Sequence, residues 1–191
     1  MRPIAQSVIT DEHQALAAML RSLLMLVAQA RRDQCLPDFS LLRAMLFYVD
    51  EFPERQHHPK ETTLLFPLLR QRCPALAPVL DRLDADHGRG EHAIRELEHA
   101  LLAFEVMGDA RREPFERTLR RYVDGYLEHM AVEEREVLPA AHKYLTEDDW
   151  LQLDEAFAAN RDPLTGHPAD AAYDGLFRKI LMTAPSPIGL G

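Results

Sequence analysis

Three histidine–glutamate pairs recur along the chain, and in each pair the glutamate follows the histidine by four residues. The pairs are His57/Glu61, His87/Glu91 and His129/Glu133, and a single histidine, His13, precedes them. On a helix, this spacing places the two side chains on one face, one turn apart. Imidazole and carboxylate groups on one face suit a first-row transition metal such as iron, manganese or zinc. The recurrence of the pair therefore predicts a metal site.

Two of these pairs belong to an internal repeat. In both copies a histidine is followed by a glutamate four residues later and by a proline ten residues later; the residues are His57, Glu61 and Pro67, then His129, Glu133 and Pro139. A further histidine precedes each copy by a similar number of residues: His13 precedes the first copy and His87 the second. Four residues after His87 stands Glu91, whereas four residues after His13 stands Ala17. The chain thus resembles two helical hairpins of one design, the second with one more potential ligand.

A single pair of this kind is more often an ordinary hydrogen bond on a helix surface. Three pairs in repeat register are difficult to explain in that way, because three buried carboxylates without a cation would be costly. His58 follows His57 directly and should point about 100° away around the helix, so we expect it to be at most an outer partner of the ligands. Tyr126 precedes His129 by three residues and is either such a partner or an ordinary core tyrosine.

Apolar residues at helical spacing predict the elements that position these side chains. Long helices are expected from Thr10 to Arg32, from Ser40 to Cys73 with a kink or break caused by its prolines, from Pro74 or Pro78 to Gly108, and from Glu113 to Tyr144. Shorter helices are expected from Thr146 to Phe157 and from Ala169 to Met182. The prediction is an all-α fold, an antiparallel up-down-up-down four-helix bundle with one or two short additional C-terminal helices. Residues 1–145 would form the bundle, and residues 146–191 an extension that packs on it or forms an oligomer surface.

Composition excludes several classes of protein. The 191 residues are 47% apolar and 28% charged, as is usual for a soluble globular domain. With 31 acidic and 22 basic residues the formal charge is −9, which argues against a general binder of nucleic acid or anionic membranes. The two cysteines, Cys35 and Cys73, predict free thiols. No apolar run suits a signal peptide or a membrane span, so a cytoplasmic location is expected.

The combined pattern resembles the hemerythrin-like domain, also called the HHE cation-binding domain, over about Ser7 to Tyr144. The residues that carry the resemblance are His13, the His57-His58-Pro59-Lys60-Glu61 and Leu65-Phe66-Pro67 stretches, His87/Glu91 and His129/Glu133. The resemblance implies a four-helix bundle around two iron ions joined by an oxygen atom. One iron would take His13 and His57, and the other His87, Glu91 and His129. Glu61 and Glu133 would bridge the two ions. Manganese or a mixed metal pair are alternatives.

Two positions depart from the oxygen-carrying hemerythrins. These have histidine where this chain has Glu91, and aspartate where it has Glu133. An extra carboxylate favours the ferric state, which argues against simple oxygen transport. Because Ala17 leaves the first iron one ligand short, we expect the open position on the His13/His57 iron.

The resemblance implies a non-haem di-iron protein that binds or reacts with O2, peroxide or NO, in sensing or in oxidative or nitrosative stress. One alternative is iron storage, sensing or delivery, and another is a helical interaction module with a structural metal. Whether the protein is an enzyme stays open; weak di-iron peroxidase or oxidase activity is the form it would take. The expected partners are a small diatomic or peroxide ligand and a second copy of the chain.

Overall fold

Helices make up nearly all of the computed structural model, which describes residues 3–160, 162–167, 171–186 and 188–190. No strand occurs within these ranges, so the all-α prediction is confirmed. The first helix, α1, spans Ile4–Arg32. It begins six residues before the expected cap at Thr10, directly after Pro3, and the Thr10 hydroxyl instead donates a hydrogen bond to the Gln6 carbonyl.

The second helical stretch alternates between two kinds of helix. It consists of α2 (Phe39–Val49), a π-helical segment (Asp50–His57), α3 (His58–Lys60), a second π-helical segment (Glu61–Leu65) and α4 (Phe66–Arg72). Asp38 caps the start by accepting a hydrogen bond from the Leu41 amide. The stretch is helical without interruption from Phe39 to Arg72, so the irregularity near the prolines is a change of helix type.

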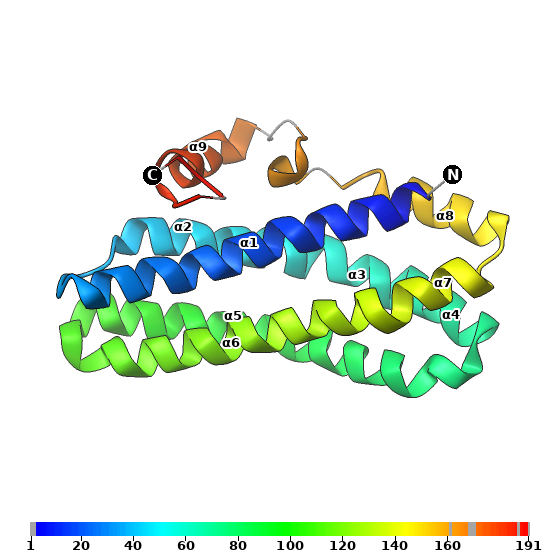
Figure 1. Cartoon of the computed structure of the whole chain (residues 1–191), viewed down its shortest axis with the longest axis horizontal. Helices are drawn as coiled ribbons and strands as arrows, with labels where there is room; N and C mark the ends of the chain where they lie inside the picture. The colour runs from blue at the N-terminus through cyan, green and yellow to red at the C-terminus, as the bar shows by residue number, and fades with distance from the viewer. Residues whose placement is uncertain (1–2, 161, 168–170, 187, 191) are drawn as a thin grey trace.

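The second half of the molecule contains two further long stretches. After a 3₁₀ turn at Pro74–Leu76, α5 spans Ala77–Met107 and ends at Gly108, whose positive φ of 73° favours glycine. A 3₁₀ turn (Gly108–Arg111) leads into α6 (Arg112–Val132), a third π-helical segment (Glu133–Val137) and α7 (Leu138–Tyr144). Figure 1 shows these stretches lying along the long axis of the molecule.

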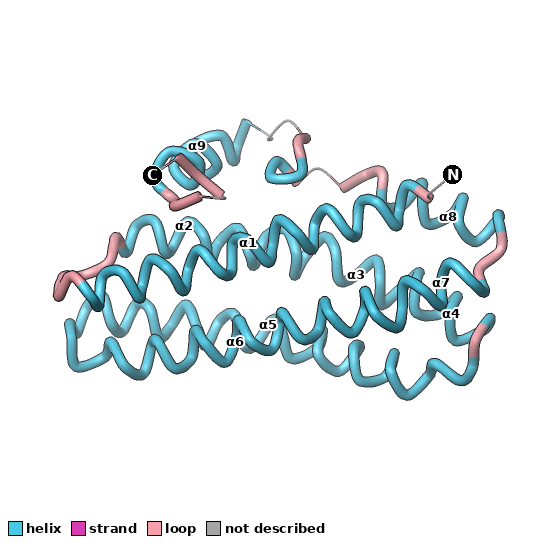
Figure 2. The backbone as a smooth tube through the Cα atoms, viewed as in Figure 1, coloured by secondary structure: helices cyan, strands magenta, loops and turns pink. Residues whose placement is uncertain are grey.

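The C-terminal residues add two short helices outside the long stretches. The first, α8, spans Glu147–Phe157 and starts with a capping box between Thr146 and Asp149. Two 3₁₀ turns (Pro163–Thr165 and Ala171–Tyr173) precede α9, which spans Asp174–Thr183. The start of the helix expected from Ala169 lies outside the described residues. Contacts join α8 to α1 and α9 to α2, and Figure 2 shows both loop and helical turns among the described residues between the two short helices.

Two separate hydrophobic clusters stabilise the long stretches. One contains Leu16, Phe52, Ile94 and Tyr126 among its members, and the other contains Ile9, Leu65, Leu83 and Val132. Along each stretch, one predicted histidine ligand lies between a residue of the first cluster and a residue of the second. The fold therefore holds the four histidines at one level, between two apolar layers. None of the helices within the described ranges combines the length and apolar character that a bilayer-spanning helix needs.

Candidate metal centre

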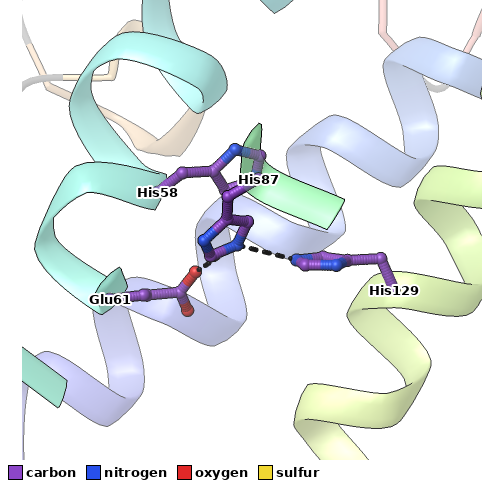
Figure 3. Close-up of side chains that lie close together, drawn as sticks. All are labelled: His58, Glu61, His87 and His129. Carbon is purple, nitrogen blue, oxygen red and sulfur yellow. Dashed lines mark hydrogen bonds and ion pairs between the residues drawn. The ribbon is translucent and has the colours of Figure 1, made fainter. Parts of the chain in front are cut away.

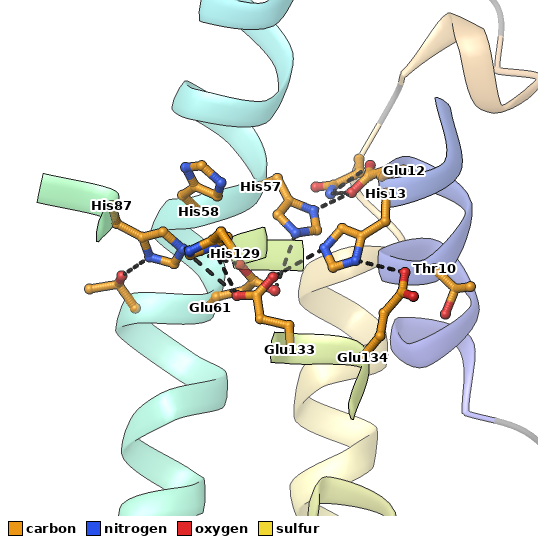
Figure 4. A network of polar contacts seen from close by, with 12 residues as sticks. Thr10, Glu12, His13, His57, His58, Glu61, His87, His129, Glu133 and Glu134 are labelled. Atoms are coloured by element: carbon orange, nitrogen blue, oxygen red, sulfur yellow. Dashed lines mark hydrogen bonds and ion pairs between the residues drawn. The ribbon is translucent and has the colours of Figure 1, made fainter. Parts of the chain in front are cut away.

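Six of the seven predicted ligands converge at this level between the apolar layers. They are His13 from α1, His57 and Glu61 from the second stretch, His87 from α5, and His129 and Glu133 from the fourth stretch. Figure 4 shows their side chains pointing toward one another. All are nearly inaccessible to solvent; Glu61 and Glu133 are each only 1% exposed. That these residues bind metal stays a prediction, but the fold brings them together.

All four histidines turn the same ring atom inward. Nε2 of His13 lies 3.3 Å from a Glu133 oxygen, and Nε2 of His57 lies 3.2 Å from a Glu61 oxygen. Nε2 of His87 and Nε2 of His129 lie 3.0 Å apart and face each other. Nitrogen atoms from four separate stretches are thus presented to one small volume, as metal ligation requires.

The outward nitrogen of each ring lies near an oxygen of another side chain. Nδ1 of His13 lies 3.2 Å from Glu134, Nδ1 of His57 lies 2.6 Å from Glu12, and Nδ1 of His87 lies 2.8 Å from the Thr62 hydroxyl. Nδ1 of His129 lies 3.7 Å from Asp86, too far for a hydrogen bond. Partners of this kind fix the ring orientation and leave Nε2 free to accept a metal ion.

Each of the two buried carboxylates lies between the two halves of the cluster. Glu61 places one oxygen 3.2 Å from His57 and the other 3.6 Å from His87. Glu133 places one oxygen 3.3 Å from His13 and the other 3.2 Å from His129. Each carboxylate therefore approaches one histidine of the first hairpin and one of the second, the arrangement that a bridge between two metal ions needs.

Several buried polar atoms of the cluster have no hydrogen-bond partner. Among the described residues they include Nε2 of His57, one oxygen of Glu61 and both oxygens of Glu133. Buried polar groups in native proteins are almost always paired, so each unpaired atom calls for an explanation. A bound cation would supply the missing partner to all four atoms at once. The donor set of imidazole nitrogen and carboxylate oxygen fits iron, manganese or zinc.

The pKa values of the clustered histidines shift in different directions, upward for His13, His57 and His129 and downward for His58 and His87. Burial alone would lower the pKa of His13, but the nearby carboxylates of Glu133 and Glu134 outweigh it and raise this pKa to about 9. The pKa of His57 is raised well above its ordinary value, because the attraction of Glu61 outweighs burial. Burial and the neighbouring histidines lower the pKa of His87 to about 3. A metal ion entering this cluster would have to displace the proton of His13.

The structure does not bring Glu91 into the cluster, which corrects the sequence prediction for this residue. Its side chain is 66% exposed and pairs with Arg95 on the surface of α5. The neighbouring position, Gly90, faces inward instead, and a Cβ there would lie 2.7 Å from a carboxylate oxygen of Glu54. The space beside His87 is therefore filled by Glu54, and the helix turns Glu91 to solvent.

His58 takes the place that the sequence assigned to Glu91. Its ring stacks on that of His87 with centroids 4.1 Å apart, and His58, Glu61, His87 and His129 form a group whose potential ligand atoms all lie within 4.8 Å of one another (Figure 3). The angle of about 100° between adjacent residues explains the result. His57 faces α1, whereas His58 faces α5 and α6, and the cluster extends around both sides of this helix.

A buried carboxylate that sequence reasoning missed supports His58. Glu54 lies 3.2 Å from Nδ1 of His58 and accepts hydrogen bonds from the hydroxyls of Tyr126 at 2.6 Å and Tyr122 at 3.1 Å. The Tyr126 hydroxyl therefore contacts both Glu54 and the ring of His58, as the expected outer partner would. Burial, with repulsion from His57, lowers the pKa of His58 well below its ordinary value, so the ring is neutral and able to bind metal. In the sequence, Gly90 was the one sign of the buried Glu54 carboxylate, because only a residue without a Cβ leaves room for it.

A cavity of about 20 Å³ adjoins the cluster. Its lining includes His13, His57 and His58 on the polar side and Phe52, Met130 and Leu16 on the apolar side. The volume is enough for one molecule about the size of water. It lies beside His13 and His57, the half of the cluster with fewer potential ligands.

Comparison with known proteins agrees with this geometry. The family model for the hemerythrin HHE cation binding domain matches residues 5–141, which include all the residues of the cluster. No curated protein matches the chain.

Proposed function

Because the chain belongs to the hemerythrin HHE cation binding domain family, we propose that it is a non-haem di-iron protein that binds or reacts with O2, peroxide or NO. Its long helices would form the antiparallel up-down-up-down bundle that this role requires. The observation that carries the proposal is the position of the two buried carboxylates, each of which offers one oxygen to either half of the cluster.

The donors divide into two sets. His13 and His57 would hold one ion and His58, His87 and His129 the other, with Glu61 and Glu133 shared. His58 thus replaces Glu91 as the additional donor of the second set. The first set remains one donor short, and the small cavity lies beside it. We therefore place the binding position for the small ligand at the His13/His57 side, for a different reason than the contrast between Ala17 and Glu91.

Bound iron would supply redox chemistry toward small oxygen and nitrogen species. The protein's own part is to fix the rings of His13, His57 and His87 through their outward partners and to exclude bulk water. The apolar lining and the small volume of the cavity favour a small, weakly polar molecule such as O2 or NO over a larger substrate.

Anaerobic loading of the metal-free protein with Fe(II) tests the proposal. Metal analysis should find two iron ions per chain, and exposure to air or NO should change the optical spectrum. Azide should alter the spectrum of the oxidised protein. A chain that retains no iron after desalting would contradict the proposal. Two retained ions with no spectral response to O2, NO, peroxide or azide would favour a structural metal instead.

A further inference from the structure

The outward partner of His57 is itself held by a residue far along the chain. Glu12 of α1 lies 2.6 Å from Nδ1 of His57, and Figure 4 shows the carboxylate beside the ring. Both oxygens of Glu12 accept hydrogen bonds from the side-chain amide of Asn160, at 2.9 Å and 3.0 Å. Asn160 is the single asparagine of the chain and is only 2% exposed. The C-terminal extension thus reaches the candidate metal centre through one intermediate side chain.

The amide of Asn160 is fixed at both of its ends. Its nitrogen donates to Glu12, and its oxygen accepts a hydrogen bond from the ammonium group of Lys60. Lys60 also lies over the ring of Phe157, the last residue of α8. Because an ammonium group can only donate, the amide has one workable orientation, with its N–H groups toward Glu12.

His57 differs in this respect from the other three inward-facing histidines. Their nearest outward oxygens come from Glu134, Thr62 and Asp86, all within the residues that match the family. Among the described residues, only the path from His57 leads on to a residue beyond position 141. The extension therefore contributes to the half of the cluster that adjoins the cavity.

We propose that Asn160 is a positioning residue for the metal centre: it holds Glu12 so that His57 keeps Nε2 directed into the cluster, and it thereby links metal binding to docking of the C-terminal segment. The proposal rests on the metal-binding function proposed above. Loss of an outer partner of a metal-bound histidine typically weakens metal affinity 10- to 100-fold. Coupling between two binding events is reciprocal, so metal binding stabilises the docked segment by the same factor.

Zn(II) affinity of the full-length chain, measured by competition with a chelator, tests the proposal without redox chemistry. Asn160→Ala should weaken binding of one zinc equivalent by about 10-fold or more. Asn160→Asp should weaken it at least as much, because it replaces the donor by a second carboxylate facing Glu12. The matched control is Tyr173→Phe, which removes a 2.7 Å hydrogen bond between the extension and Glu51, a residue outside the two groups of potential metal ligands. This control should bind zinc like the unmodified chain.

A double-mutant cycle separates positioning from simple packing. With Glu12→Ala already present, Asn160→Ala should cost no further zinc affinity, because the path to His57 is already cut. Hydrogen exchange should slow at the backbone amides of Asn160 and Thr165 when zinc binds, since both donate hydrogen bonds within the docked segment. This protection should be absent in the Asn160→Ala variant.

Other results would overturn the proposal. Unchanged zinc affinity of Asn160→Ala, in a chain that binds zinc, contradicts the positioning role and leaves the proposed function intact. If Asn160→Ala lowers the zinc affinity equally in the unmodified chain and in the Glu12→Ala variant, Asn160 acts by packing alone. An unmodified chain that binds no metal contradicts the proposed function itself, and this inference with it.

Discussion

His58 lies in the cluster and Glu91 lies on the surface of α5, so the ligand role proposed for His58 is open to a direct test. His58→Ala should weaken binding of one metal equivalent by at least the roughly 10- to 100-fold that loss of an outer partner costs. Glu91→Ala is the control: its side chain is 66% exposed and pairs only with Arg95 among the described contacts. Its effect on metal affinity should be negligible and its effect on stability within about 0.5 kcal/mol. Titration with Co(II), followed by its visible absorption, measures both variants. The assignment is wrong if Glu91→Ala is the variant that loses metal.

Spacing of four residues predicts that two side chains share a face, but it does not say which face turns inward. For His57/Glu61 and His129/Glu133 the inferred face is the buried one. For His87/Glu91 the outcome differs. Gly90 faces inward against the carboxylate of Glu54, and Glu91 faces solvent. Glu54 comes from another helix, and no periodicity within α5 reports its position. The hydrogen bond from Asn160 to Glu12 could not be predicted either, since it depends on how the C-terminal segment packs against α1.

At the level of the helices, π-helical segments coincide with the candidate ligands. Glu61 and Glu133 each open such a segment, and in both the carbonyl of the glutamate accepts from the amide five residues later, at Phe66 and Leu138. Wider turns of this kind often occur at functional sites. The prolines gave the clue, because a proline within a helix crowds the carbonyl four residues earlier and leaves it without a partner. Sequence reasoning expected a kink and did not predict the change of helix type.

The tight approach of α5 to the second stretch makes Gly90 unlike its neighbour Gly88. A Cβ at Gly88 would meet nothing within 4 Å, so Gly88→Ala should stabilise the helix by about 1 kcal/mol. A Cβ at Gly90 would displace Glu54 from its tyrosine hydrogen bonds. Gly90→Ala should therefore be less stable than Gly88→Ala by about 1–3 kcal/mol, the cost of leaving a buried polar group unpaired. Urea unfolding of the metal-free variants measures the difference. Equal stability of the two variants would show that Glu54 moves without cost.

For the whole molecule, the apolar periodicity was sufficient to predict an all-helical fold with four long stretches. Each stretch carries apolar residues on both sides of its histidine, and these form the two hydrophobic clusters. The repeat of the ligand pairs correctly indicated that the stretches meet at one level. The boundary expected between residues 145 and 146 stays a prediction, and the link from Asn160 to Glu12 shows how closely the two parts interact.

Metal binding should stabilise the molecule, and more so at higher pH. In the metal-free protein the pKa of His13 is raised from 6.5 to about 9, since the nearby carboxylates of Glu133 and Glu134 outweigh burial. A raised pKa contributes stability that is present below about 6.5 and is lost as the pH rises through about 9. The metal-free protein should therefore lose this contribution toward pH 9.

Zinc must also displace the proton of His13, which costs progressively less toward pH 9. The stabilisation by zinc should therefore be larger at pH 8.5 than at pH 6.5, because less of the His13 proton remains to be displaced. At 100 times its dissociation constant, a metal ion adds about 2.7 kcal/mol, which corresponds to roughly 5–10 °C in Tm for a chain of this size. Thermal unfolding with and without zinc at the two pH values measures the increment. In His13→Gln the pH dependence should shrink; an increment in the unmodified chain that does not grow with pH would contradict the protonated His13 inferred for the metal-free cluster.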